Sequence, residues 1–165
     1  YIEVESAAGR GATFEIYLPL CEQCAAPEAS EQSSPEGGAE TILVVDDEPA
    51  VAATAERILR HWGYNVIVAA GGKQGIEIYE NRWREIDAVI LDLVMPDANG
   101  ETCFDEMRRI NPSAKVALSS GYSLEKTVTK LMKRGAGAFV MKPFTPVGLA
   151  KAVRKVLDEG GRVTI

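Results

Sequence analysis

From residue 41 onward, the sequence alternates five times between a short apolar segment and a longer segment with helical periodicity. Strands are expected at 41–45, 64–69, 86–91, 115–119 and 138–141. The first, third and fourth are nearly continuous apolar runs, which is typical of strands in a sheet that helices cover on both faces. Segments 48–62 and 146–159 carry apolar stripes at helical spacing. This order predicts an α/β fold with a doubly wound, five-stranded parallel sheet.

The part of the chain before this pattern differs in composition. Residues 1–40 hold eight acidic residues and one basic residue, whereas residues 41–165 hold 16 acidic and 17 basic residues. Residues 1–20 alternate as two strands around a turn, and such a hairpin is too small to form a core alone. Residues 21–40 are rich in Pro, Gly, Ser and Glu, which predicts a flexible acidic linker. We therefore expect a hairpin remnant of another domain, a linker, and an α/β domain over 41–160.

Composition also argues against several classes of protein. Neither part of the chain has the basic excess of a nucleic-acid binder. No run approaches the roughly 20 apolar residues of a membrane helix, so we expect no membrane contact by this fragment. Three cysteines do not make a disulfide scaffold, which favours a reducing compartment and a cytoplasmic location. Cys21 and Cys24 form a CxxC without the second pair that a zinc site needs.

The chemistry of the chain is expected where the strands end. Asp46 and Asp47 follow the first strand, Asp92 the third, Ser119 ends the fourth, and Lys142 follows the fifth. In a parallel sheet these carboxyl ends share one edge, where ligands bind. Carboxylates about 4 Å apart repel by roughly 4 kcal/mol per pair at an effective dielectric of 20, and a divalent cation removes that cost. Oxygen ligands without nearby His or Cys suit Mg²⁺ or Mn²⁺, and a carboxylate beside such an ion can attack phosphorus.

Four motifs carry a resemblance to a known family. They are ILVVDDEP at 42–49, VILDLVMPDANG at 89–100, ALSSGY at 117–122 and AFVMKPF at 138–144. In order and spacing they resemble the receiver domain of two-component response regulators. The resemblance implies a flavodoxin-like sheet with strand order 2-1-3-4-5. It also implies that Asp92 is the phosphoacceptor, and that Asp46, Asp47 and the backbone carbonyl of Val94 bind Mg²⁺ together with Asp92.

The same resemblance implies further roles. Ser119 would be the switch hydroxyl, Phe139 the switch aromatic residue and Lys142 the lysine that contacts the phosphoryl group, with a cis bond before Pro143. In receivers, the residues two past the phosphoacceptor and two past the switch hydroxyl overhang the path of the attacking water. In this sequence these two residues are Val94 and Gly121.

The leader carries a second, shorter resemblance. YIEVES at 1–6 and GRGATFEIYLP at 9–19 resemble the final hairpin of a histidine-kinase ATP-binding domain. The order of kinase end, linker and receiver is that of a hybrid histidine kinase. The phosphoryl donor would then be a phosphohistidine domain of the same parent chain, and the acceptor a histidine phosphotransfer protein, unless the receiver acts as a phosphate sink. The fragment lacks the kinase catalytic core, and His61 is expected to be a solvated residue near a helix end.

Three alternatives stay open at this point. An aspartate-nucleophile hydrolase of the haloacid dehalogenase type uses similar groups, but it needs a second Asp where this chain has Val94. A transcription-factor response regulator would need a DNA-binding domain after the receiver. A stand-alone receiver would not need the kinase-like leader.

Overall fold

The computed structural model describes residues 1–18, 37–121 and 125–159 of the chain. It divides into two compact units, Tyr1–Ser33 and Ser34–Ile165, and each is described by itself. The second is called the α/β unit. Its strands are β3 (Thr41–Val45), β4 (Asn65–Ala69), β5 (Ala88–Asp92), β6 (Val116–Ser120) and β7 (Ala138–Met141). Its helices are α1 (Pro49–His61), α2 (Gly72–Arg82), α3 (Gly100–Ile110), α4 (Glu125–Lys133) and α5 (Pro146–Glu159).

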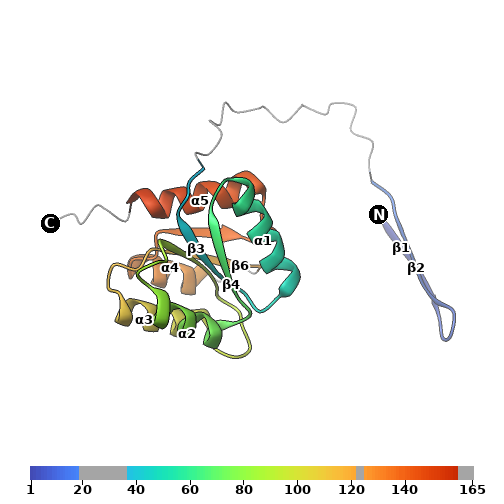
Figure 1. The fold of residues 1–165 in the computed structure, drawn as a ribbon. Helices are drawn as coiled ribbons and strands as arrows, with labels where there is room; N and C mark the ends of the chain where they lie inside the picture. Colours follow the sequence, from blue (N-terminus) through green and yellow to red (C-terminus); the bar gives the residue numbers. More distant parts are fainter. Residues whose placement is uncertain (19–36, 122–124, 160–165) are drawn as a thin grey trace. The chain divides into compact units, whose positions relative to one another are not determined.

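All five strands of the α/β unit are parallel and lie in the order β4-β3-β5-β6-β7. This is the predicted order 2-1-3-4-5, and the doubly wound fold is confirmed. Helices α1 and α5 cover one face of the sheet, and α2, α3 and α4 cover the other (Figure 1). The order changes direction between β3 and β5, so the carboxyl ends of these two strands border the crevice in which such sheets bind ligands.

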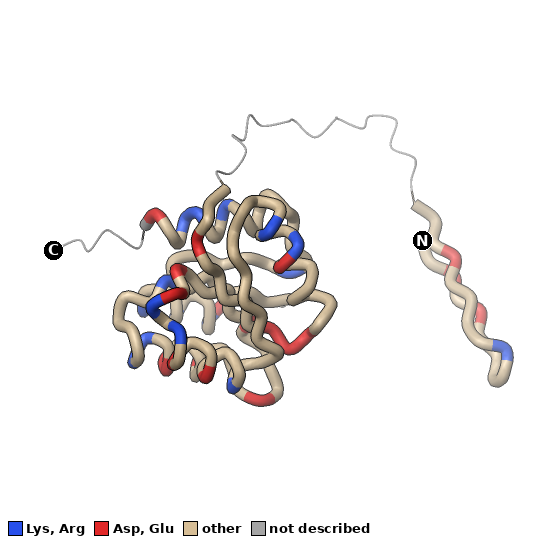
Figure 2. Tube along the Cα trace, viewed as in Figure 1, with Lys and Arg blue, Asp and Glu red and all other residues tan. Residues whose placement is uncertain are grey.

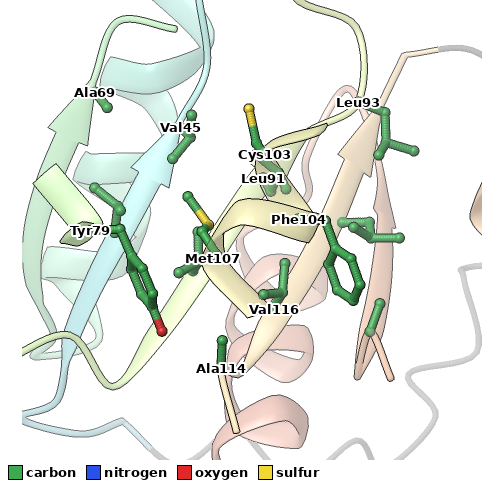
Figure 3. Close-up of a cluster of buried hydrophobic side chains, with 14 of the residues drawn as sticks. Val45, Ala69, Tyr79, Leu91, Leu93, Cys103, Phe104, Met107, Ala114 and Val116 are labelled. Atoms are coloured by element: carbon green, nitrogen blue, oxygen red, sulfur yellow. The ribbon is translucent and has the colours of Figure 1, made fainter. Parts of the chain in front are cut away.

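Alternate residues of the strands point to opposite faces of the sheet and belong to two separate hydrophobic cores. Leu43 and Val45 of β3 point to the side where Tyr79, Phe104 and Met107 of α2 and α3 pack (Figure 3). Their neighbours in β3 point to the side where α1 and α5 place their apolar stripes. Both faces of the sheet are covered, which explains the nearly continuous apolar runs of the strands. The charged residues occur mainly along helices and loops (Figure 2).

The first unit contains β1 (Ile2–Ala7) and β2 (Gly11–Ile16), which pair as an antiparallel hairpin. Gly9 and Gly11 adopt positive φ angles of 76° and 82° in the turn, a conformation that glycine adopts without strain. Every residue of both strands is exposed. The hairpin predicted from the alternating pattern is therefore present, with its apolar side chains uncovered among the described residues.

Observed boundaries differ from the expected ones by one or two residues. Helix α1 begins at Pro49, where the missing N–H of proline costs no helical hydrogen bond. Strand β5 extends to Asp92, which pairs with Ser119, and β6 extends to Ser120, which pairs with Met141 of β7. These two polar residues therefore belong to the ends of the strands and not to the loops that follow.

Candidate functional site

Three carboxylates meet at the carboxyl edge of the sheet. Asp46 and Asp47 directly follow β3, and Asp92 is the last residue of the neighbouring strand β5. One side-chain oxygen from each lies within 4.8 Å of the others. Asp46 and Asp92 are 3% and 4% exposed, whereas Asp47 is half-buried at the rim. The structure thus brings together the three aspartates that the sequence analysis selected.

Lys142 connects two of these carboxylates. Its Nζ lies 2.6 Å from Asp46 Oδ2 and 2.8 Å from Asp92 Oδ2, although it arrives from the end of β7. The Lys142–Pro143 peptide bond is cis, as the resemblance implied. The backbone N–H of Glu48 donates to Asp46 Oδ1 at 3.0 Å, which satisfies the second oxygen of that carboxylate. A buried charge is tolerated only with such partners.

Burial and ion pairing shift the pKa values of Asp92 and Lys142 in opposite directions. Burial raises the pKa of Asp92 above its usual value, although the hydrogen bond and the positive charge of Lys142 favour the ionised carboxylate. Burial alone would lower the pKa of Lys142, but its hydrogen bonds to Asp46 and Asp92 outweigh that effect and raise it. Lys142 therefore stays an ammonium group at neutral pH.

An open pocket of about 370 Å³ leads to Asp92. Its lining residues are Asp47, Glu48, Pro49, Asp92, Val94, Gly121 and Lys142. The side chain of Val94 is 51% exposed, and its N–H donates to Asp92 Oδ1 at 3.3 Å. Among the residues that the structure describes, a methyl group added at Gly121 would meet nothing closer than Lys142 Cβ at 4.0 Å. One wall is therefore apolar, and the wall at Gly121 is open.

Ser119 and Phe139 lie beside the aspartate cluster. Ser119 is 1% exposed, and its Oγ has no hydrogen-bond partner among the described residues. Its β5 neighbour in the register is Asp92. Phe139 of β7 is half-buried against the core under α3 and α4. A buried hydroxyl without a partner is costly, so Ser119 is a group available to accept or donate a bond to an incoming ligand.

Asp97 was not selected from the sequence, yet it positions the loop that follows β5. Its carboxylate accepts hydrogen bonds from the N–H groups of Gly72 and Lys73, at 3.0 and 2.9 Å. These N–H groups, the one of Lys73 foremost, lower the pKa of Asp97. The loop that carries Val94 is thereby tied to the start of α2. No sequence signal reveals this contact, because the partners are 24 and 25 residues apart.

The cluster of three carboxylates and one ammonium carries two uncompensated negative charges when all four groups are ionised. Oxygen ligands of this kind fit a hard divalent cation such as Mg²⁺. The part of the Val94 carbonyl in metal binding stays a prediction. His61 is exposed at the end of α1, Cys103 is buried in α3, and Cys21 and Cys24 lie outside the described residues.

Comparison with known proteins identifies relatives of the α/β unit. Residues 42–154 match the family described as the response regulator receiver domain. The chain is similar to the sensor kinase CckA of Brucella abortus, with 34% identity over 168 residues, which cover 96% of this chain and 18% of that protein. It is similar to the chemotaxis protein CheY of Thermotoga maritima, with 32% identity over 70% of this chain and 95% of that protein.

Solved structures agree with the sequence matches. A response regulator receiver domain protein from Clostridium thermocellum superposes with a TM-score of 0.70 and 28% identity, over 73% of this chain and 95% of that one. The chain spans about a fifth of the length of the sensor kinase and about a quarter of the transcriptional regulator ZraR of Escherichia coli that it also matches. In the described part of the chain, no helix is long and apolar enough to cross a membrane.

Proposed function

The chain belongs to the response regulator receiver domain family over residues 42–154, and from this we propose that it accepts a phosphoryl group on Asp92 in a Mg²⁺-dependent reaction of a phosphorelay. One observation carries the proposal. The buried Asp92 carboxylate lines an open pocket, 2.8 Å from the Lys142 ammonium and within 4.8 Å of oxygens of two further carboxylates. This arrangement offers a nucleophile together with the charges that would hold a phosphoryl group.

The transfer requires one bond to form and one to break. An oxygen of Asp92 attacks the phosphorus of a phosphohistidine, and the P–N bond breaks with its electron pair returning to the imidazole nitrogen. Lys142 Nζ, already 2.8 Å from Asp92 Oδ2, would turn to a phosphoryl oxygen as the carboxylate loses its charge. Ser119 Oγ, buried and unpartnered among the described residues, would donate to another phosphoryl oxygen.

Asp46, Asp47 and Asp92 would hold the magnesium ion, with the Val94 carbonyl as a further ligand. When bound, Mg²⁺ would offset the negative charge of the carboxylates and of the phosphoryl oxygens. The closeness of the three carboxylates supports this assignment, because they lie within 4.8 Å of one another. Asp46 shares its charge with Lys142, so Asp47 at the rim is the carboxylate best placed for direct ligation.

We further propose that the chain is part of a cytoplasmic hybrid sensor histidine kinase. The similarity to the sensor kinase CckA covers 96% of the chain and therefore reaches into the hairpin and the linker, beyond the family match that begins at residue 42. The donor would then be a phosphohistidine domain of the same parent chain, and the acceptor a histidine phosphotransfer protein. A phosphorylatable His helix and a nucleotide-binding motif in the upstream gene sequence would support this origin, and their absence would contradict it.

A stand-alone receiver is the second candidate. The similarity to the chemotaxis protein CheY of Thermotoga maritima spans 95% of that protein, which supports this candidate. A phosphohydrolase of the haloacid dehalogenase type is disfavoured because Val94, which lines the pocket, cannot act as the general acid.

Phosphorylation by acetyl phosphate tests the proposed chemistry. With Mg²⁺ present, intact-mass spectra should show one phosphoryl group per chain, and none in Asp92→Asn, because an amide is no nucleophile. Asp47→Ala should raise the Mg²⁺ concentration required. The matched control is Asp105→Asn, which changes a carboxylate on α3 outside the pocket and should be labelled like the wild type. Equal labelling of Asp92→Asn and the wild type would overturn the proposal.

A further inference from the structure

The four residues before β3 make contacts that a flexible linker would not make. The backbone N–H of Gly38 donates to the carbonyl of Trp62 at 3.1 Å, and the N–H of Asn65 donates to the carbonyl of Glu40 at 2.9 Å. The Asn65 side chain donates to the carbonyl of Ala39 at 2.7 Å. Residues 37–40, which we name the strap, are thus bound to the turn between α1 and β4.

The strap is also tied to α5. Arg154 Nη1 lies 2.8 Å from Glu40 Oε1, and the side chains are 22% and 29% exposed. The same guanidinium group pairs with Asp158 one turn further along the helix. An ion pair that is partly shielded from water and fixed by a second carboxylate is stronger than an isolated surface pair. Arg154 therefore connects the last turns of α5 to the residue that enters the sheet.

Close packing around the strap leaves no room for side chains at two of its positions. A Cβ at Gly37 would lie 2.2 Å from the carbonyl oxygen of Trp62. A Cβ at Gly38 would lie 1.8 Å from Glu40 Oε2 and 2.9 Å from the ring of Tyr64. Gly63, at φ +92°, also lies close to the strap, because a Cβ there would lie 2.9 Å from the carbonyl oxygen of Gly38. The Gly37-Gly38 pair thus allows the backbone to lie directly on its partners.

We propose that the strap is an anchoring device that fixes where the preceding chain joins the receiver, with Arg154 as the positioning residue that holds Glu40. The strap lies before residue 42, where the family match begins. It leads into the amino end of β3, whereas the aspartate pocket lies at the carboxyl end of the same strand. The fixed end of the linker is therefore at the edge of the sheet opposite Asp92, and any group delivered by the preceding part of the chain must reach around the α/β unit.

Amide hydrogen exchange in the full 165-residue chain tests the anchor, with Gly38 and Asn65 as reporters and Val44 and Ile90 as core references. In Arg154→Ala and in Glu40→Gln, the reporters should exchange roughly tenfold faster and the references at the wild-type rate. The double variant should exchange no faster than either single variant, because both remove the same contact. Arg109→Ala is the control, since it removes an exposed arginine that pairs within α3.

Other results would overturn the proposal. Unchanged reporter rates in either single variant would show that the Glu40–Arg154 pair does not hold the strap. Equal acceleration at the reporters and at the references would show that Arg154 stabilises the whole α/β unit and not the strap. Gly38→Val gives an independent check, because its side chain must displace Glu40 or Tyr64, and it should accelerate exchange at Asn65 even with Arg154 intact.

Discussion

Lys142 shows at the scale of single residues how this pocket is held together. Burying a carboxylate as deeply as Asp46 or Asp92 without a partner would cost several kcal/mol of hydration free energy. One ammonium group compensates two of them, at 2.6 and 2.8 Å. The third carboxylate, Asp47, stays at the rim, where water reaches it. Lys142 therefore compensates the two buried carboxylates, and the pocket still carries the negative charge that attracts a cation.

Val94 leads to a prediction about the lifetime of the proposed aspartyl phosphate. Its side chain is half exposed at the pocket wall and offers no group to orient a water molecule. Replacing it with a polar residue, in Val94→Asn, should accelerate hydrolysis roughly tenfold or more, because a positioned side chain contributes substantially to water attack. The decay of phosphorylated wild type and variant in excess Mg²⁺ measures the effect.

Gly121 supplies the matched control for that experiment. Among the described residues, a methyl group there meets only Lys142 Cβ, at 4.0 Å, so Gly121→Ala should fold normally and should not accelerate the decay. If Val94→Asn decays no faster than the wild type, Val94 does not limit the attack of water.

The residues of the pocket were largely predictable because a parallel sheet brings its strand ends together. Asp46, Asp47, Asp92 and Lys142 each occur directly at a strand end. The structure brings the three carboxylates within 4.8 Å of one another and pairs Lys142 with Asp46 and Asp92. Asp97 could not be found in this way, since its partners begin a helix on another part of the chain. Contacts between a loop and a distant backbone leave no periodic trace in a sequence.

At the scale of elements, α4 is held differently from the other helices. Of its described residues, Leu131 is the fully buried one, with Val128 and Met132 packed partly against the core. Lys130 of α4 and Arg134, which directly follows the helix, pair with Glu101 and Asp105 of α3. Since exposed ion pairs contribute little to stability, α4 is weakly bound to the sheet and is a suitable element for a shift.

This arrangement predicts how the proposed switch responds to a phosphoryl mimic. In a beryllofluoride complex, Ser119 should move toward the ligand and Phe139 should turn inward, which biases an equilibrium between two states. Chemical shifts should then change from Ser119 to Phe139 and along α4. The exposed surface of α1, which packs on the other face of the sheet, should change little. Changes confined to residues that line the pocket would contradict a switch.

The helices and strands were predicted from the periodicity of apolar residues, but several of the residues at which they begin or end were not. The five predicted apolar segments form the five strands. The order of the strands, which reverses direction between β3 and β5, was implied by the resemblance and not by the apolar pattern. The ends of β5 and β6 were missed by one residue, because a polar residue at a strand end is held by its register partner and not by burial of an apolar side chain. Composition assigned the strap to the flexible linker. Two glycines are expected both in a flexible segment and in a segment whose backbone packs closely on its neighbours, so composition does not distinguish the two.

At the scale of the whole molecule, the hairpin and the α/β unit should differ in stability. On one face of the hairpin, Ile2 opposes Ile16 and Val4 opposes Phe14, all exposed, while Glu3 directly opposes Glu15 on the other face. A two-stranded hairpin without a packed face is marginal in water, and opposed like charges weaken it further. Amides of β1 and β2 should therefore exchange near the rate of an unfolded peptide in this chain, whereas those of β3 and β5 should be protected.

The same hydrogen-exchange measurement can contradict this prediction for the hairpin. Protection of β1 and β2 comparable with that of β5 would show that its apolar face is covered in solution. In the proposed parent protein, the side chains of that face would pack on the preceding part of the kinase, which explains why they are apolar.

The most direct test of the account is to identify the residue that carries the phosphoryl group. The chain is phosphorylated with acetyl phosphate and Mg²⁺, the acyl phosphate is reduced with borohydride, and the peptides are sequenced by mass spectrometry. Because reduction converts a phosphorylated aspartate into homoserine, the account predicts homoserine at position 92 and unchanged aspartate at positions 46, 47 and 97. Homoserine at any other position, or none at position 92 in a chain that gained a phosphoryl group, would contradict it.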